Sequence, residues 1–352
     1  MNTNTKNVSL SRNDKITLIS NFYTMLSSGI PILETVDSLL EDAKGGTKKL
    51  LTTLRDDLVQ GQHVSTTFAK FPNIFDKVTV NILKASEEAG TLDKSLKDLK
   101  DTIKKENEFN DKIRSALIYP CFIIVLFIAV FVMILVVVIP KISTVFSRLN
   151  VPLPLPTKIM IGMSNALISY PIPIIIGAII LITTVVFLYK KNRRLFMRVL
   201  TSLPLVSKLT RQIDLTRVTR NLNLLLSAGI PITIALDLTQ DVVVKNDLRE
   251  VVTHIKEVVI GGKNLSQGLK DRKKQVPQIM IKIIEAGERS GELDKAMLDV
   301  ADYLDYEVTN SLKTLTALIE PLLLVFVGIA VGGMMLAIIG PIYGMIGQIG
   351  PH

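Results

Sequence analysis

The chain has 352 residues, one cysteine, three histidines and a net charge of +9, with a mean hydropathy of +0.39. A single cysteine excludes a disulfide framework, and the scattered histidines leave no cluster with metal-ligand spacing. Hydrophobic residues make up 48% of the chain and are concentrated in a few long runs. The composition therefore predicts a membrane protein rather than a soluble enzyme.

The sequence contains the same unit twice, with an offset of 200 or 201 positions. The repeated features are LSSGIPI at 26–32 and LSAGIPI at 226–232, ASEEAGTLDK at 85–94 and AGERSGELDK at 286–295, and Pro120 and Pro140 against Pro321 and Pro341. Each copy is a polar unit that runs into a long apolar segment. Two such units predict a membrane-anchored docking scaffold rather than a catalyst.

Three apolar runs have the length of membrane spans. The first, 116–139, holds 24 residues without a charge, enough to cross a hydrocarbon core of about 30 Å. The second covers 169–189, and the third covers 316–340 with Glu320 as its only charge. We expect three transmembrane helices, although a buried core helix is the alternative for any one of them.

Flanking charges predict the orientation of these spans. Lys112 and Arg114 precede the first span, and Lys313 precedes the third. The window 190–220, after the second span, holds nine basic residues and one acidic residue. Because positive charge stays in the cytoplasm, the N-terminus is expected inside and the C-terminus outside. This charge also suits anionic lipid better than nucleic acid, since the window has a single aromatic residue.

This orientation also assigns each segment between and beyond the spans to one side of the membrane. We expect cytoplasmic helical domains at 1–115 and 190–315, an external loop at 140–168 and an external tail at 341–352. The first and third spans match in the repeat, so they cross in the same direction and the second span is the return. The repeats are therefore parallel, unlike the inverted repeats of many transporters.

Both polar halves are predicted to be helical, because their apolar residues recur at three- and four-residue steps. Within LSSGIPI and LSAGIPI, Gly29 and Gly229 suit a left-handed residue that ends one helix. Pro31 and Pro231 suit the first turn of the next. Strand signals are almost absent, which predicts an all-α fold.

The second repeated motif also predicts a helix that ends at glycine and restarts, with leucine needed for the core. A corner of this kind does not explain the matching Glu87 and Glu288. They could pair with backbone amides or a basic residue, or be presented to a partner. The candidate structural or partner residues from both motifs and the third span are Gly29, Pro31, Glu87, Gly90, Leu92, Gly229, Pro231, Gly287, Glu288, Ser290, Gly291, Leu293, Glu320 and Pro321.

Catalytic motifs are missing from the sequence. It has no phosphate-binding loop, since Gly261-Gly262-Lys263-Asn264 does not fit the pattern Gly-x-x-x-x-Gly-Lys-Ser/Thr. It also has no Gly-x-Ser-x-Gly elbow and no His-Glu-x-x-His helix. We therefore expect no enzyme activity, no cofactor and no metal. Glu320 in the third span lies either at the cytoplasmic headgroup level, with Pro321 in the first turns of that helix, or in a functional site.

The spacing of small residues in and after the third span favours close helix packing. Gly328 and Gly332 form one Gly-x-x-x-Gly pair, and Gly340 and Gly344 form another beyond an expected break at Pro341. Small residues four positions apart let helices approach closely in lipid. Flexible packing is the alternative.

The doubled Leu-x-x-Gly-Ile-Pro and Gly-Glu-x-Ser-Gly-x-Leu motifs resemble those of the F-domain family of type II secretion systems, which includes the platform proteins of type IV pili. The motif at 287–293 matches in full, whereas the first copy has Ser86 and Ala89 in place of glycine and serine. The Pro-rich stretch 149–157 also resembles the family's loop.

This resemblance implies two homologous cytoplasmic bundles of about six helices each. It also implies a multi-pass platform in the cytoplasmic (inner) membrane that couples a motor ATPase to pilin or pseudopilin assembly or disassembly. The implied partners are that ATPase, the pilin subunits, other inner-membrane assembly proteins, lipid and a second copy in a dimer, without nucleic acid. The alternative function is a transporter or channel component.

Overall fold

The structure, a computed structural model, describes residues 8–148, 155–174, 176–177, 180, 183–184, 204–240, 243 and 245–348. Within these ranges the regular elements are all helices, which confirms the predicted all-α class. The chain divides into two units: unit 1 contains Met1–Lys112 and Lys208–Asn310, and unit 2 contains Ile113–Ser207 and Ser311–His352. Each half of the repeat contributes to both units.

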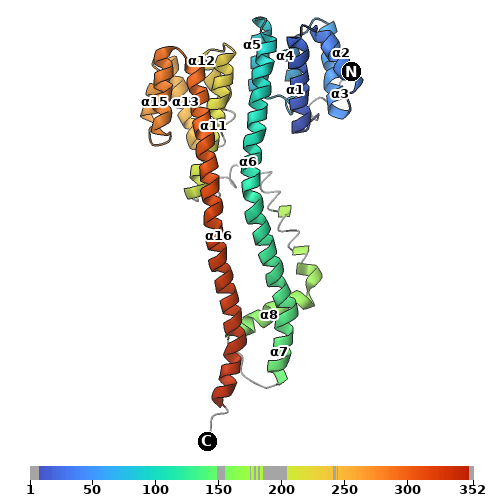
Figure 1. Cartoon of the computed structure of the whole chain (residues 1–352), viewed down its shortest axis with the longest axis vertical. Helices are drawn as coiled ribbons and strands as arrows, with labels where there is room; N and C mark the ends of the chain where they lie inside the picture. The colour runs from blue at the N-terminus through green and yellow to red at the C-terminus, as the bar shows by residue number, and fades with distance from the viewer. Residues whose placement is uncertain are drawn as a thin grey trace. The chain divides into compact units, whose positions relative to one another are not determined.

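Unit 1 holds two groups of helices that correspond one to one (Figure 1). The first helix group consists of α1 (Arg12–Ser27), α2 (Ile32–Glu41), α3 (Gly45–Val59), α4 (Val64–Ala69), α5 (Lys77–Glu88) and the start of α6 (Leu92–Met133). The second helix group consists of α11 (Pro204–Ser227), α12 (Ile232–Thr239), α13 (Asn246–Ile260), α14 (Leu265–Asp271), α15 (Gln278–Ser290) and the start of α16 (Leu293–Gln348).

Helix α1 shows how the sequence builds these elements. The side chain of Ser11 accepts a hydrogen bond of 3.1 Å from the backbone N–H of Asp14, which caps the helix. Leu18, Ile19 and Phe22 are buried at three- and four-residue spacing, as the periodicity predicts. Burying such an apolar stripe contributes about 25 cal/mol per Å² of apolar surface removed from water.

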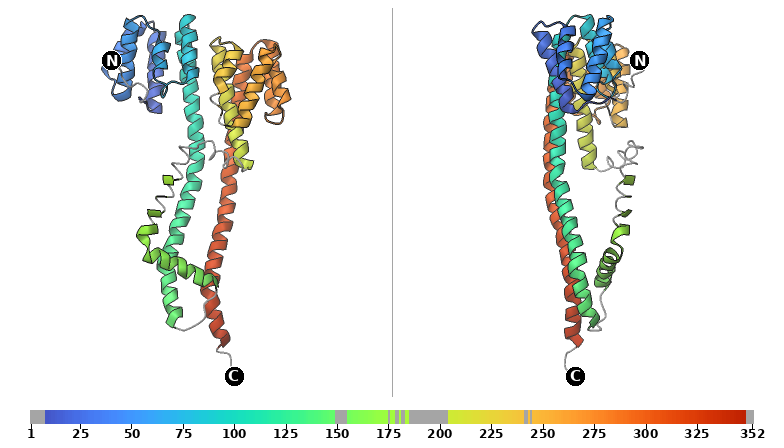
Figure 2. Two further views of the ribbon diagram at one scale, coloured as in Figure 1. Left: turned by 180° about the vertical axis from the view of Figure 1, so that it is seen from behind. Right: turned by 90° about the vertical axis from the view of Figure 1, so that its right-hand side faces the viewer.

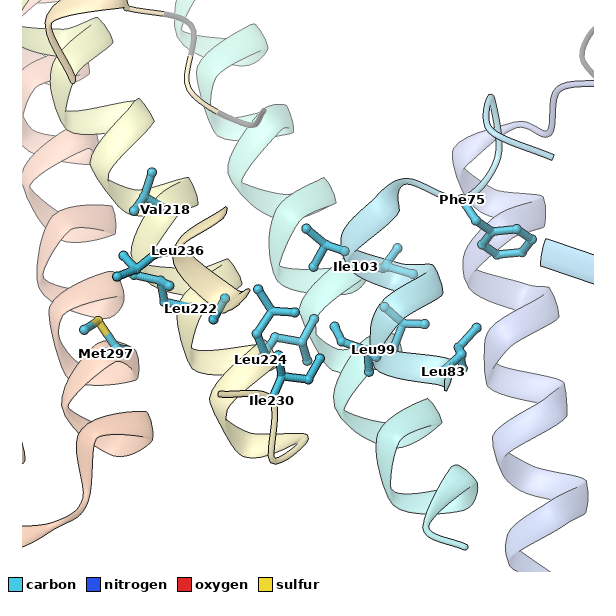
Figure 3. Close-up of a cluster of buried hydrophobic side chains, with 14 of the residues drawn as sticks. Phe75, Leu83, Leu99, Ile103, Val218, Leu222, Leu224, Ile230, Leu236 and Met297 are labelled. Carbon is cyan, nitrogen blue, oxygen red and sulfur yellow. The ribbon is translucent and has the colours of Figure 1, made fainter. Parts of the chain in front are cut away.

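The cores of the two helix groups form one continuous apolar cluster. Helix α5 contacts α12, and the side chains of Leu224 and Ile230 lie beside Leu99 (Figure 3). Along α6 and α16, the ammonium of Lys112 lies 2.9 Å from the carboxylate of Asp305. The two halves of the duplication are therefore packed against each other within unit 1.

Unit 2 contains the apolar continuation of both long helices. The rings of Phe127 on α6 and Phe326 on α16 meet edge to face with centroids 5.3 Å apart, so these helices lie side by side there. By length and composition, two helical stretches among the described residues could cross a membrane, 92–144 and 293–333. They overlap the first and third predicted spans, whereas 10 of the 21 residues of the second, 169–189, lie outside the described residues.

Two sequence-based boundaries in unit 2 are wrong. Pro321 is not in the first turns of its helix, because α16 begins at Leu293, and the break expected at Pro341 is absent, because α16 continues to Gln348. The repeat-related Pro120 likewise lies inside α6. A proline removes one hydrogen bond from a helix, but long apolar helices tolerate this where neighbours and local adjustments satisfy the freed group.

The segment 140–168, expected as an external loop, is largely helical. A short π-helix, η2 (Ile134–Val138), leads into α7 (Ile139–Arg148), and α8 (Leu155–Ser169) packs across both (Figure 2). Pro156 sits in the first turn of α8, where proline is tolerated. Residues 149–154 of the Pro-rich stretch lie outside the described residues.

Candidate functional site

Each helix group has three equivalent corners at which a helix ends on a glycine with φ between 69° and 82°. These glycines are Gly29, Gly61 and Gly90 in the first helix group and Gly229, Gly262 and Gly291 in the second. At all six, the N–H of the residue after the glycine donates to the carbonyl five positions earlier, over 2.8 to 3.2 Å. This bond closes the helix end and satisfies a carbonyl that would otherwise be unpaired.

The corner at Gly229 shows the geometry in detail. The N–H of Gly229 donates to the Leu226 carbonyl over 2.9 Å, and the N–H of Ile230 donates to the Leu225 carbonyl over 3.0 Å. Its φ of 79° is strained for residues with a Cβ. Pro31 and Pro231 stand as the N-caps of α2 and α12. The prediction of a left-handed glycine is confirmed, whereas the prolines expected in the first turn of the next helix lie one position before it, at the N-cap.

The two repeated glutamates clamp the start of a neighbouring helix. The carboxylate of Glu87 accepts from the backbone N–H groups of Val64 and Ser65, over 2.6 and 3.0 Å. Glu288 accepts in the same way from Leu265 and Ser266. Each carboxylate thus binds the first two N–H groups of α4 or α14, where a negative charge is favoured. Of the roles that the sequence left open, pairing with backbone amides is shown for both glutamates, and the ring of His63 also lies 3.9 Å from the Glu87 carboxylate.

This clamp joins two corners of each group. Glu288 is near the end of α15, next to the corner at Gly291, and the N–H groups that it binds follow the corner at Gly262. The third corner is held to α16, because the side-chain amide of Asn223 donates to the Asp294 carbonyl over 2.8 Å. The three corners of the second helix group therefore lie at one end, beside the start of α16.

Other residues of the second motif bring helices close together. A Cβ placed on Gly287 would come within 2.3 Å of the Ala296 Cβ, so only glycine allows α15 and α16 to approach this far. The hydroxyl of Ser290 donates to the Gly287 carbonyl over 3.3 Å. Leu92 and Leu293 begin α6 and α16 and pack against the core. These residues shape the corner.

The structure does not bring Glu320 and Pro321 to these corners. Both lie in the part of α16 that belongs to unit 2, and the side chain of Glu320 is exposed. The candidate residues thus fall into two sets: the corner residues of unit 1, which contact one another, and this pair in unit 2. Among the described residues, no group of three His, Cys, Asp or Glu side chains could hold a metal ion.

Sequence reasoning missed the corners at Gly61 and Gly262. The sequence does contain a signal for them, because Gly61 and Gly262 are 201 positions apart, which is also the offset between the two copies of the second motif. It also missed a buried carboxylate, Asp57, which accepts from the Thr67 hydroxyl and the Lys70 ammonium, each over 2.6 Å. An acidic residue in an amphipathic helix predicts an exposed position, so periodicity alone could not find Asp57.

A first prediction concerns the left-handed corner. Replacing Gly229 by Val should lower the free energy of unfolding by about 2 kcal/mol, because a β-branched residue is strained at positive φ. Space is not the cause, since no atom lies within 4 Å of an added Cβ. Thermal unfolding in detergent measures the loss. Gly333→Ala is the control, because Gly333 has equally open surroundings without positive φ and belongs to neither Gly-x-x-x-Gly pair. Equal stability of the two variants would contradict the prediction.

A second prediction concerns the glutamate clamp. Glu288→Ala should expose the N–H groups of Leu265 and Ser266 to exchange and cost about 1 kcal/mol, as for other lost helix caps. Hydrogen–deuterium exchange should rise in the peptide around residues 262–270 and stay unchanged around residues 61–69, which Glu87 clamps. Glu292→Gln, at an exposed position outside the clamp, is the matched control. Unchanged exchange at the start of α14 would refute the clamp.

Comparison with known proteins agrees with this duplicated architecture. The profile of the family described as "Type II secretion system (T2SS), protein F" matches the chain twice, at residues 18–140 and 218–341. The chain is 27% identical over 339 residues to the type IV pilus assembly protein PilC of Myxococcus xanthus, covering 96% of this chain and 81% of that protein. It is 31% identical over 330 residues to PilC of Thermus thermophilus, covering 93% and 81%.

A relative from a secretion system is about as similar to this chain as the two PilC proteins are. The type II secretion system protein F of Vibrio cholerae is 27% identical over 325 residues, covering 92% of this chain and 80% of that protein. The two profile matches include all six glycine corners and both glutamate clamps, and they extend into the apolar parts of α6 and α16. The chain belongs to the type II secretion system protein F family.

Proposed function

We propose that this protein is an integral-membrane platform of a type IV pilus or a type II secretion system. In this role it couples a cytoplasmic motor ATPase to the assembly or disassembly of pilin or pseudopilin subunits. The observation that carries the proposal is the double family match, in which each copy joins a clamped helix group to an apolar helix. The relatives named for pilus assembly and for secretion both match over nearly the whole chain.

The proposed topology has two homologous cytoplasmic bundles of about six helices and three transmembrane helices. The bundles are 1–115 and 190–315, and the spans are 116–139, 169–189 and 316–340. Exposure of the apolar helices supports the membrane placement: the side chains of Phe122 and Val125 on α6 and of Leu322 and Ile329 on α16 are 60 to 69% exposed. Such surfaces are too large and too apolar to face water.

The mechanical part of the proposal depends on how the bundles are connected to the spans. Helices α6 and α16 are each continuous from the polar half into the apolar half, and a helix transmits a displacement along its axis without a flexible joint. The glutamate clamp fixes the end of α5 or α15, immediately before each long helix, to the start of the neighbouring helix α4 or α14. A partner that moves a bundle would therefore move the attached span, without a nucleotide site in this chain.

The partners follow from the same role. They are the motor ATPase on the cytoplasmic side, pilin or pseudopilin subunits in the membrane, other inner-membrane assembly proteins and surrounding lipid. We also propose a dimer in the membrane. The pairs Gly328/Gly332 and Gly340/Gly344 on α16 have the four-residue spacing that allows close contact between helices in lipid.

Deletion and capture test this function together. A strain that lacks the gene should lose fibres or secretion, and the tagged wild-type chain should restore them. Capture of the tagged chain from mild detergent should recover the motor ATPase and a pilin. Glu292→Gln should restore the function as well as wild type, and Glu288→Ala less well. If fibres and secretion persist in the deletion strain and capture recovers neither partner, the proposal is wrong. Solute movement by the purified chain in liposomes would favour a transporter instead.

A further inference from the structure

Helix α8 belongs to unit 2 and turns a side with both polar and apolar residues inward. It contacts η2 and α7, and its buried residues include Thr157 and Ser164, which are 3% and 0% exposed. Seven positions apart, these two residues lie on the same face of the helix. Met160, Ile161 and Leu167 are partly buried on this same side, so the inward side of α8 is mixed in polarity.

The outward side of α8 also carries apolar residues. Leu155, Ile159 and Met163, spaced four apart, are 76%, 62% and 45% exposed. We call these three residues the α8 strip. Four-residue spacing makes them neighbours on the helix surface. A continuous strip of this kind on an exposed helix marks a surface that contacts something other than water.

Polar residues run beside the α8 strip. Lys158, Asn165 and Ser169 are exposed along one edge of it, and α8 contains no acidic residue. The exposed surface is thus divided lengthwise into an apolar side and a polar side with one positive charge. This division is typical of a helix that lies in a membrane interface, with its basic residue near anionic headgroups.

The position of α8 on the long helix agrees with this division. Its contact partner η2 is at the end of the apolar run 116–139, and Val136 and Val137 of η2 are themselves 40% and 45% exposed. The α8 strip therefore adds to an apolar surface that the long helix already presents. With 15 residues, α8 is about 22 Å long, too short to cross a core of about 30 Å.

We propose that α8 is an interfacial helix whose α8 strip is inserted into the acyl-chain region of the phospholipid bilayer, at the membrane surface toward which α6 runs. The segment 140–168 is then a membrane-inserted anchor rather than a loop in solution. This inference rests on the proposed membrane placement of α6. It adds a lipid-binding surface to unit 2 and sets the depth at which that unit meets the membrane surface.

Fluorescence quenching in vesicles tests the proposal. The full chain with Cys121→Ala, which removes its one cysteine, receives a single cysteine at Ile159, Asn165 or Val125 and an environment-sensitive fluorophore. Vesicles of phosphatidylcholine and phosphatidylglycerol carry lipids with a nitroxide near the headgroup. The label at position 159 should be quenched by these lipids about twice as strongly as that at position 165, since interfacial helices bury one side by about 5–10 Å. Iodide dissolved in the water should quench the label at position 165 more strongly than the label at position 159. A label at Met163 repeats the test if the Ile159 variant folds poorly.

Other patterns of quenching would overturn the proposal. Iodide quenching at position 159 equal to that at position 165, without quenching by lipid, would overturn the proposal because the strip would lie in water. Protection of position 159 from both quenchers would overturn it as well, because protein or a second copy would cover the strip. The Val125 label reports on the span alone. If lipid nitroxides placed deep in the acyl chains fail to quench it, the membrane placement of α6 itself is wrong.

Discussion

The ends of the helices impose the main constraint on this protein. Each helix group turns through tight corners, and every corner leaves backbone N–H and C=O groups that no helix can satisfy internally. Left-handed glycines satisfy carbonyls at six helix ends, and Glu87 and Glu288 satisfy the first N–H groups of α4 and α14. The short helices depend on this solution, since isolated helices of six or seven residues are unstable in water.

The duplication preserves the glycine corners and the glutamate clamps, while the side chains around them differ between the two helix groups. In the first helix group, the buried carboxylate of Asp57 binds the hydroxyl of Thr67 and the exposed ammonium of Lys70. The second has no acid at the equivalent position, Val258. In the second, a hydrogen bond from Lys270 lowers the pKa of the Glu285 carboxyl, and nearby Arg289 adds to the effect. One backbone design thus supports two different surfaces, which suits a scaffold that meets several partners.

The two helix groups meet at a polar junction next to the shared core. Arg220 of α11 is buried under the ring of Phe109 on α6, with its guanidinium carbon 5.5 Å from the ring centroid. Burial lowers the pKa of this guanidinium, while the carboxylates of Asp305 and Glu106 act in the opposite direction. A buried charge requires such partners, because an isolated one is costly to remove from water. The junction therefore favours one particular pairing of α6, α11 and α16.

The sequence by itself determined the features that depend on local chemistry. The helical class follows from periodicity, the duplication from motif spacing, and the corners at Gly29 and Gly229 from the conformational freedom of glycine followed by proline. Those same motifs were enough to suggest the family. Span-length apolar runs were equally visible, because hydropathy is a property of neighbouring residues.

Only the tertiary structure decided the features that join residues far apart in the chain. Glu288 was an obvious candidate, yet its role became clear only when α15 placed it beside Leu265, 23 positions earlier. The exposure of the apolar α8 strip and the continuation of α16 through Pro341 are also features that only the tertiary structure decided. A helix's faces and its tolerance of proline are set by what packs against it, and that information is absent from any local stretch of sequence.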